Sequence, residues 1–432
     1  MERSDFKVHE SPRLEEKYYE ITHRSGLRIY IHPKDFSNTV AMLTVLFGSS
    51  DREFVDGSGG RVEVPAGSAH FLEHKMFETE DGEDIFYVFS QYGANSNAFT
   101  SNEITSYYFS CTDCFRESLG TLLGFVLDPH FTRESVEKEK DIIRQEIRSG
   151  EDSPKNRIYY ELLRLMYFSP AFSDTVCGAE SDIDSIDADA LALCQRTFYR
   201  PDNMVLTVCG RVAPEEVLSI VDEHLGDLAA SGDAVRRVQP NEPMENRCDF
   251  SEIRMDVSRP LFAFGIKDSI SCLDERCRLK RRIAVNLLLD ATFGHSGEFF
   301  SQNYKRGVLT NNFAAEYEMF TDHAFVMVSG ESDSIEVLRR AFFEKIGYLA
   351  SEGISEEDFT RMRRSAYADS VTGFDSPDVI AENLIECAVT GNRLFDPSDT
   401  IPEITYEYVR EVASEVFDPG RIACALVLPL ED

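Results

Sequence analysis

Cysteine and basic residues are both scarce in this chain, and each scarcity excludes a class of protein. Ten cysteines in 432 residues are too few for a disulfide scaffold. Cys111–Cys114 is a CxxC without a second such pair, which makes it a weak metal signal that also fits a helix cap after a strand.

Forty-four basic residues against 77 acidic ones give a net charge of −33. Phosphate contacts need a basic surface, so nucleic acid is excluded as a partner. The acidic surface could attract basic peptides or serve solubility alone.

Long apolar runs and a secretory signal are missing as well. No run approaches the roughly eighteen apolar residues of a membrane helix, so no membrane association is expected. The amino terminus, Met1–Lys7, is charged and polar, unlike a secretory signal. The expected location is therefore the cytoplasm. With 42% apolar residues the chain can form packed cores, and its length suggests two or three domains.

The feature that carries chemistry is a His-x-x-Glu-His motif at residues 70–74. On a helix, His70 and His74 lie four residues apart on one face, with Glu73 beside them. Two imidazoles and a further carboxylate make a zinc site with three protein ligands, whose fourth position stays open for water. Glu73 is then placed to take a proton from that water, as metal-assisted peptide hydrolysis requires.

A second segment with helical periodicity offers the further carboxylate. Glu139 and Glu146 are seven residues apart in an amphipathic stretch at 132–150, so they share one face. Glu146 could complete the zinc site, and Glu139 could orient a ligand from behind. An unselected pair of this kind would more often be two acids on a solvated helix face. The histidine motif upstream favours the metal site.

With these residues in view, the chain resembles the pitrilysin/insulysin (insulinase-like) family of zinc peptidases, in which the motif reads His-x-x-Glu-His and which includes the mitochondrial processing peptidase. The likeness rests on the motif, on the acidic pair and on Gly93–Thr100 between them. The residues on either side of the motif, Gly67–Ala69 and Lys75–Glu78, are similar to those of a short, YmfH-like bacterial branch. The resemblance is specific for residues 67–155 and is one of layout beyond them.

The resemblance implies a role for each residue of the site. A single Zn²⁺ per chain is bound by His70, His74 and Glu146. Glu73 is the catalytic base, and Glu139 assists it by orienting a ligand.

The resemblance also implies a substrate-binding strand. In the family, the strand that corresponds to residues 95–100 is a sheet edge that pairs with the substrate backbone beside the zinc. Asn97, Ala98 and Phe99 are therefore candidates for substrate binding. Taken alone, the same residues favour an ordinary half-buried strand.

The order of strands and helices in the second half of the chain repeats that of the first, which indicates an internal duplication. We expect an α+β fold with two homologous domains, each a mainly antiparallel sheet covered by helices. The boundaries are a zinc-binding peptidase domain at 1–228, a polar linker at 229–248 and a homologous second domain at 249–432. Leu287–Phe293, where the second domain would carry the motif, is apolar, so no metal site is expected there. The resemblance implies that the chain forms a half-ring of a peptidase clamshell.

One departure from the family concerns the oxyanion. Many relatives place an Arg and a Tyr, seven residues apart, in the second domain to hold the substrate carbonyl, but Asn303 and Thr310 stand at these positions. Losing such a donor typically lowers the rate by a factor of about a hundred to a thousand. We expect a related subunit, in a homodimer or heterodimer, to supply the pair. Arg306 or Tyr304 could instead substitute locally.

The expected function is that of a zinc metalloendopeptidase that hydrolyses unstructured peptides in a chamber between half-rings. The alternative is a non-catalytic zinc-binding scaffold or peptide-binding subunit of a processing complex, or a maturation chaperone that binds peptides without cutting them. All of His70, Glu73, His74 and Glu146 are present, whereas degenerate relatives lack some of them. The complete set favours hydrolysis.

Overall fold

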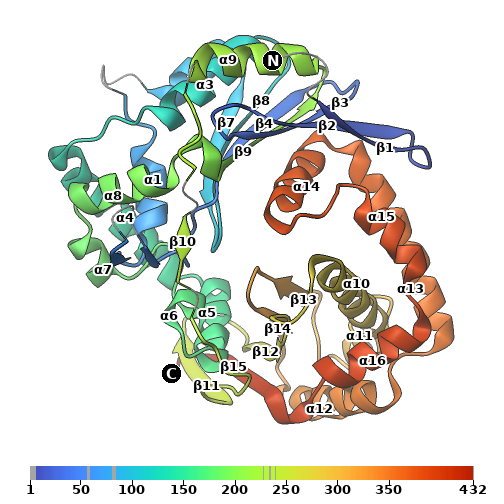
Figure 1. Cartoon of the computed structure of the whole chain (residues 1–432). Helices are drawn as coiled ribbons and strands as arrows, with labels where there is room; N and C mark the ends of the chain where they lie inside the picture. The colour runs from blue at the N-terminus through green and yellow to red at the C-terminus, as the bar shows by residue number, and fades with distance from the viewer. Residues whose placement is uncertain are drawn as a thin grey trace. The chain divides into compact units, whose positions relative to one another are not determined.

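The computed structural model describes residues 6–55, 59–79, 84–226, 228–232, 235–238 and 240–431. The chain divides into two compact units, and both are discontinuous in sequence (Figure 1). Unit 1 comprises Met1–Ile147, Thr175–Gln239 and Thr372–Leu394, and unit 2 comprises Arg148–Asp174, Pro240–Val371 and Phe395–Asp432. Each half of the chain thus contributes one short segment to the unit formed mainly by the other half. The linker expected at 229–248 includes residues 233, 234 and 239, which lie outside the described residues.

Unit 1 is built on a seven-stranded sheet in the order β1-β2-β3-β9-β4-β8-β7. The strands are β1 (Lys7–Ser11), β2 (Glu16–Thr22), β3 (Arg28–Pro33), β4 (Thr39–Val45), β7 (Asn95–Thr100), β8 (Thr105–Cys111) and β9 (Met204–Gly210). Only β3 and β9 pair in parallel; the other neighbours are antiparallel. Every residue of β4 and β9 is buried, as expected of central strands covered on both faces. β7 is the last strand of the order, so it forms an edge of this sheet.

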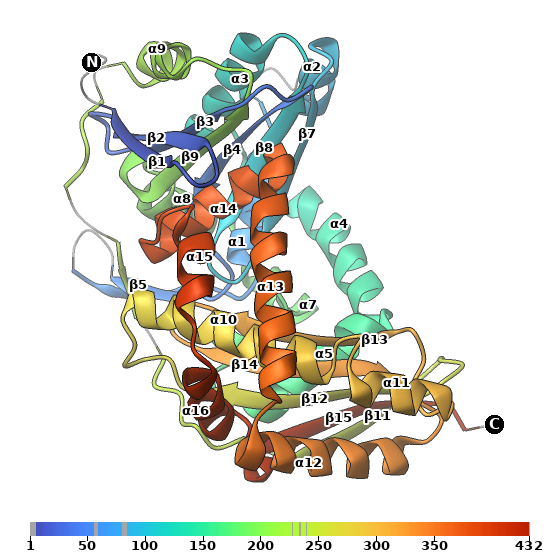
Figure 2. The same cartoon turned by 90° about the vertical axis from the view of Figure 1, so that its right-hand side faces the viewer.

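Helices cover this sheet on both faces (Figure 2). α3 and α9 lie over one face, and α14 packs against β9 and β4 on the other. α1 and α2 contact β7, and α1 also packs against α8. The helices of this unit are α1 (Ser68–Lys75), α2 (Ile85–Gln91), α3 (Phe115–Leu127), α4 (Arg133–Glu151), α7 (Glu180–Ser185), α8 (Ala188–Phe198), α9 (Pro214–Leu225) and α14 (Pro377–Thr390), with the end of α4 continuing into unit 2. A small sheet in the order β10-β5-β6 completes the unit, with β5 at Glu53–Val55, β6 at Arg61–Glu63 and β10 at Arg236–Arg237.

Unit 2 is built on a five-stranded sheet in the order β11-β15-β12-β14-β13. Its strands are β11 (Phe250–Met255), β12 (Leu261–Asp268), β13 (Phe313–Met319), β14 (Ala324–Glu331) and β15 (Ile422–Pro429). α5 packs against β12 and β15, while α10 and α12 pack against α16. The helices are α5 (Pro154–Met166), α6 (Pro170–Ser173), α10 (Glu275–Thr292), α11 (Glu298–Lys305), α12 (Ile335–Glu352), α13 (Glu356–Thr372), α15 (Asp396–Thr400) and α16 (Tyr406–Val416). Short 3-10 turns lie in both units: at Pro201–Asn203 and Gly373–Asp375 in unit 1, and at Ile401–Glu403 and Pro419–Arg421 in unit 2.

The two sheets repeat one topology, which confirms the duplication read from the sequence. In unit 1, β3 pairs in parallel with β9, and β4, β8 and β7 then follow in antiparallel pairing. In unit 2, β11 pairs in parallel with β15, and β12, β14 and β13 follow in the same way. The α+β class with two similar domains is therefore confirmed. Among the described residues, no helix is long and apolar enough to cross a bilayer.

Candidate metal centre

The helix that carries the motif, α1, begins at a glycine that the packing requires. Gly67 caps the helix with φ of 81°, a left-handed conformation that glycine adopts without strain. A Cβ at this position would lie 2.2 Å from the carbonyl oxygen of Cys177. The start of α1 is therefore in close contact with the loop at Cys177. This contact fixes the position of the motif helix relative to that loop.

The two motif histidines meet on the carboxylate of Glu146, which projects from α4. His70 Nε2 lies 3.4 Å from Glu146 Oε1, and His74 Nε2 lies 3.4 Å from Glu146 Oε2. The side chain of His70 is only 10% exposed, whereas Glu146 is 46% exposed. The three predicted ligands are thus brought together, and the two imidazoles are less exposed to solvent than the carboxylate. A donor set of two imidazoles and a carboxylate is one that catalytic zinc sites use.

Glu139 lies seven residues, about two helical turns, before Glu146 on α4. It contacts the second motif histidine, His74. Its Oε1 lies 3.1 Å from His74 Nδ1, so the imidazole nitrogen that faces away from Glu146 also has a carboxylate partner. Glu139 Oε2 in turn accepts from Lys75 Nζ at 3.3 Å. The Lys75 side chain is fully buried and also contacts Glu78. A carboxylate behind a metal-binding histidine fixes the tautomer and the orientation of its ring.

The ionisable groups of this cluster shift one another's pKa values. Burial disfavours the charged imidazole, but the Cys177 sulfur and the Glu146 carboxylate outweigh it and raise the pKa of His70 to about 10. Burial acts in the same way on His74, and its contacts with Glu139 and Glu146 again raise the pKa. The same contacts hold the pKa of Glu146 well below its usual range, with His70 contributing most. The pKa of Glu139 is lowered by His74 despite partial burial.

These shifts predict how metal binding depends on pH. The pKa of His70 is raised from 6.5 to about 10, so the imidazole is protonated below that pH and a metal ion has to displace the proton. The apparent affinity for Zn²⁺ is expected to rise with pH by up to about tenfold per pH unit for each proton displaced, levelling off only above about pH 10. Competition titrations against a chromophoric chelator from about pH 6 to about pH 9 measure the slope. An affinity that does not change with pH would show that the histidines are not the ligands.

The motif glutamate is held by a residue of the edge strand. Thr100, the last residue of β7, donates its hydroxyl to Glu73 Oε2 at 2.5 Å. The same hydroxyl lies 3.3 Å from Thr105 Oγ1 on β8. Glu73 is thereby fixed between the metal-site helix and the sheet edge. Thr100 was not singled out from the sequence, since its contact with Glu73 joins residues that lie 27 positions apart in the chain.

The three candidates for substrate binding lie on β7, next to this threonine. β7 pairs with β8, with Asn97 opposite Tyr108 and Ala98 opposite Tyr107. The amide N–H of Ala98 donates to the side chain of Asn97 at 2.9 Å. Asn97 is exposed, and Ala98 and Phe99 are half-buried. The strand is thus an edge strand, and a substrate role for Asn97, Ala98 and Phe99 stays a prediction.

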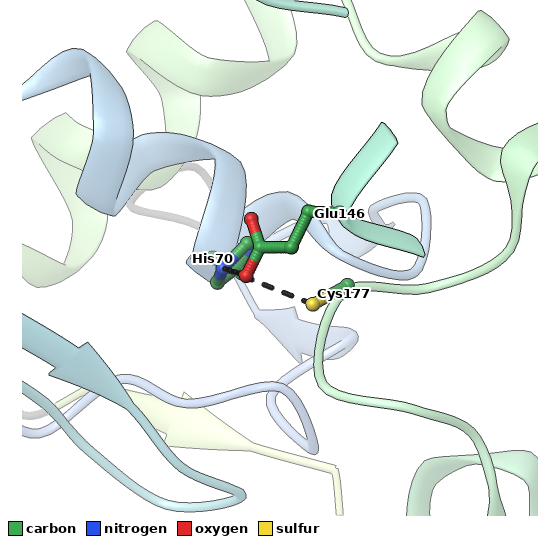
Figure 3. A group of neighbouring side chains, drawn as sticks. All are labelled: His70, Glu146 and Cys177. Carbon is green, nitrogen blue, oxygen red and sulfur yellow. Dashed lines mark hydrogen bonds and ion pairs between the residues drawn. The ribbon is translucent and has the colours of Figure 1, made fainter. Parts of the chain in front are cut away.

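A residue that the sequence did not single out also reaches the cluster. Cys177 lies in the loop before α7, and its Sγ is 3.8 Å from His70 Nε2 (Figure 3). The sulfur, the His70 nitrogen and an oxygen of Glu146 all lie within 4.8 Å of one another. Only the folded chain could show this contact, because 107 residues separate the cysteine from the histidine.

The positions of the expected Arg and Tyr have structural partners in unit 2. Asn303 is buried in α11 and donates its amide to the carbonyl of Phe299 at 2.8 Å. The hydroxyl of Thr310 accepts from the backbone N–H of Asn312 at 3.1 Å. The Asn303 amide and the Thr310 hydroxyl thus form hydrogen bonds with the protein's own backbone.

Comparisons with known proteins show which family the chain belongs to. The profile described as "Insulinase (Peptidase family M16)" matches residues 55–178, and that of the "Peptidase M16 inactive domain" matches residues 185–366. A Bacillus subtilis protein described as "Uncharacterized zinc protease YmfH" is 34% identical over 425 residues, spanning 97% of this chain and 98% of that protein. The chain belongs to the M16 (insulinase) peptidase family. The resemblance read from the motif is confirmed.

Other M16 proteins match over most of the chain. The mitochondrial-processing peptidase subunit beta of Caenorhabditis elegans is 25% identical over 406 residues, covering 87% of this chain and 84% of that one. The crystal structure of an M16-like peptidase from Alicyclobacillus acidocaldarius matches with a TM-score of 0.91 at 29% identity, covering 98% of this chain and 99% of that one. The insulinase match includes the α1 motif and also Glu139 and Glu146 of α4, whereas the inactive-domain match includes Asn303 and Thr310.

The second contact of His74 gives a prediction for Glu139. Replacing Glu139 by Gln removes the negative charge behind the imidazole but keeps the shape, so Zn²⁺ affinity is expected to fall about 10- to 100-fold. Chelator competition measures the change. Glu137→Gln is the matched control, because Glu137 is exposed on the same helix and pairs with Lys140 instead. Equal affinities for the two variants would remove Glu139 from the site.

Proposed function

We propose that the chain is a zinc-dependent endopeptidase that hydrolyses unstructured peptides, with one Zn²⁺ held by His70, His74 and Glu146. One observation carries the proposal: both imidazole Nε2 atoms lie 3.4 Å from the same carboxylate, on a helix that also presents Glu73. Zinc bound to this set would polarise the scissile carbonyl and lower the pKa of a water molecule.

The chain's own residues supply the proton transfers. Glu73 takes a proton from the attacking water and later gives it to the leaving amine. Thr100 keeps one carboxylate oxygen in a hydrogen bond at 2.5 Å, which fixes the direction of the other. Glu139 and the buried Lys75 hold the ring of His74 in place.

The edge of the first sheet supplies the substrate site. An extended peptide that adds to β7 would bind through its main chain beside Asn97, Ala98 and Phe99. Recognition of this kind depends on backbone groups more than on side chains. It therefore suits a peptidase that accepts many unfolded sequences.

A related subunit completes the site in this proposal. Asn303 and Thr310 are engaged in unit 2 by Phe299 and Asn312, and neither offers a charge or a phenol for the oxyanion. A second chain of the same family, carrying the Arg and Tyr, would provide them and enclose the peptide in a chamber.

The first experiment is cleavage of a mixed pool of unstructured peptides by the purified, zinc-loaded chain. Cleavage that disappears with a chelator and returns with Zn²⁺ supports a self-sufficient peptidase. Cleavage that appears only when a family member with the Arg and Tyr pair is added supports the two-subunit form. If zinc is bound but no peptide is cut in either case, the endopeptidase proposal is wrong.

The engagement of Asn303 and Thr310 favours one second candidate. The chain could bind zinc and peptides without cutting them, as a peptide-binding or scaffold subunit of a processing complex. Peptide binding measured by fluorescence anisotropy, with intact peptide recovered afterwards, would select this candidate.

A further inference from the structure

The thiol of Cys177 lies beside two of the three proposed zinc ligands, His70 and Glu146. Figure 3 shows its sulfur pointing toward His70 and Glu146, and the three donor atoms lie within 4.8 Å of one another. The cysteine is therefore part of a donor cluster that contains two of the proposed zinc ligands.

The separations of the His70 nitrogen from its two neighbours are close to those around a tetrahedral ion. With zinc–nitrogen and zinc–oxygen bonds of about 2.0–2.2 Å and zinc–sulfur bonds of about 2.3 Å, neighbouring ligand atoms of a tetrahedron lie about 3.3–3.6 Å apart. The observed separation is 3.4 Å from His70 Nε2 to Glu146 Oε1 and 3.8 Å from His70 Nε2 to Cys177 Sγ. His74 contacts Glu146 but does not belong to the group of donors within 4.8 Å of one another, so a shared ion would have to draw His74 and the sulfur together.

The backbone from the Cys177 carbonyl to Gly178 is tightly packed against the start of α1. A Cβ on Gly67 would lie 2.2 Å from the Cys177 carbonyl oxygen, and one on Gly178 would lie 2.8 Å from the backbone of Ala66. The Thr175 hydroxyl also donates to the Gly178 carbonyl at 2.7 Å. The position of the thiol beside His70 is therefore set by the same contact that starts the motif helix.

We propose that Cys177 binds the same zinc ion as a fourth protein ligand in the resting protein, and so closes the position that hydrolysis needs open. The inference rests on the proposed function. Structural zinc sites have four protein ligands, whereas catalytic sites leave the fourth position to water or substrate. On binding, the thiol loses its proton to solvent and sulfur donates the electron pair. On opening, water replaces the sulfur and the thiolate takes a proton back.

The test is the absorption spectrum of the chain loaded with one equivalent of Co²⁺. The wild-type protein is expected to show a sulfur-to-cobalt charge-transfer band in the near ultraviolet, and Cys177→Ala is expected to lose it while still binding cobalt. Cys272→Ser, which changes an exposed cysteine of unit 2, is the matched control and keeps the band. A wild-type protein that binds cobalt without the band overturns this inference and leaves the proposed function standing. Failure to bind any metal overturns both.

Two further measurements examine the closed state. Zn²⁺ affinity of Cys177→Ala is expected to fall at least about tenfold, because a ligand is lost. At saturating Zn²⁺ the same variant is expected to cleave peptides severalfold faster than the wild-type chain, under whichever subunit composition shows cleavage. Zinc-loaded wild-type protein is also expected to react with iodoacetamide at Cys177 more slowly than the metal-free protein. Equal cleavage rates or equal alkylation rates would overturn the closing role.

Discussion

Replacing Glu73 by Gln is expected to leave Zn²⁺ binding nearly unchanged and to lower peptide cleavage by a factor of about a hundred to ten thousand. Glutamine has the same shape, and its amide oxygen can still accept the hydrogen bond that Thr100 donates at 2.5 Å. The amide cannot take a proton from water at neutral pH, however. The variant therefore removes the base while keeping the packing of α1 against β7.

Two measurements on the same preparation separate the base from the metal. Zinc content is measured by metal analysis, and cleavage is measured with the peptide pool and the subunit composition that gives activity. Glu216→Gln is the control, since Glu216 is exposed on α9 in the same unit. If Glu73→Gln cleaves as fast as Glu216→Gln, the catalytic base has been assigned to the wrong residue.

The proximity of the candidate metal ligands was predictable in part, because the spacing within each pair is local. His70 and His74 share a helix face by their four-residue spacing, and Glu139 and Glu146 share another by their seven-residue spacing. The structure confirms that both faces exist and that they meet, with Glu146 between the two imidazoles. Helical periodicity within α1 and α4 predicted each face, whereas the expectation that the two faces meet came from the family resemblance.

The supporting residues were not predictable, because each depends on a contact far away in the chain. Lysine side chains are mostly exposed, yet that of Lys75 is completely buried between Glu78 and Glu139. Thr100 is the last residue of β7, and Cys177 lies in the loop before α7. No local pattern distinguishes such residues from ordinary ones until the fold brings them to the motif helix.

The fold was predictable to the level of its repeats but not of its compact units. The strand expected at residues 95–100 is β7 (Asn95–Thr100), and it pairs with β8 (Thr105–Cys111). α14 was not predicted as an element, and it packs against β9 and β4 rather than against the sheet of its own half of the chain. An apolar stripe shows that a helix is buried, but it does not show which sheet buries it.

The largest effect on the metal itself is expected from replacing His74 by Ala. This imidazole contacts Glu146 through Nε2 at 3.4 Å and Glu139 through Nδ1 at 3.1 Å, so its loss removes both a proposed ligand and the link between the two carboxylates. A ligand lost from the ion itself should cost more than the roughly 10- to 100-fold effect of an outer partner. We therefore expect Zn²⁺ affinity to fall by more than about a hundredfold and peptide cleavage to drop to the background of Glu73→Gln.

The effect of His74→Ala has to be compared with that of a control variant, and both proteins have to be shown to be folded. His130→Ala changes an exposed histidine before α4 and is expected to keep both metal and activity. Thermal unfolding of the metal-free proteins shows whether His74→Ala is still folded, and added Zn²⁺ is expected to raise the midpoint of the wild-type chain but not that of the variant. If zinc still stabilises His74→Ala as much as it stabilises His130→Ala, the ion binds elsewhere, because a site formed by His70, His74 and Glu146 cannot keep its affinity after losing one of two imidazoles.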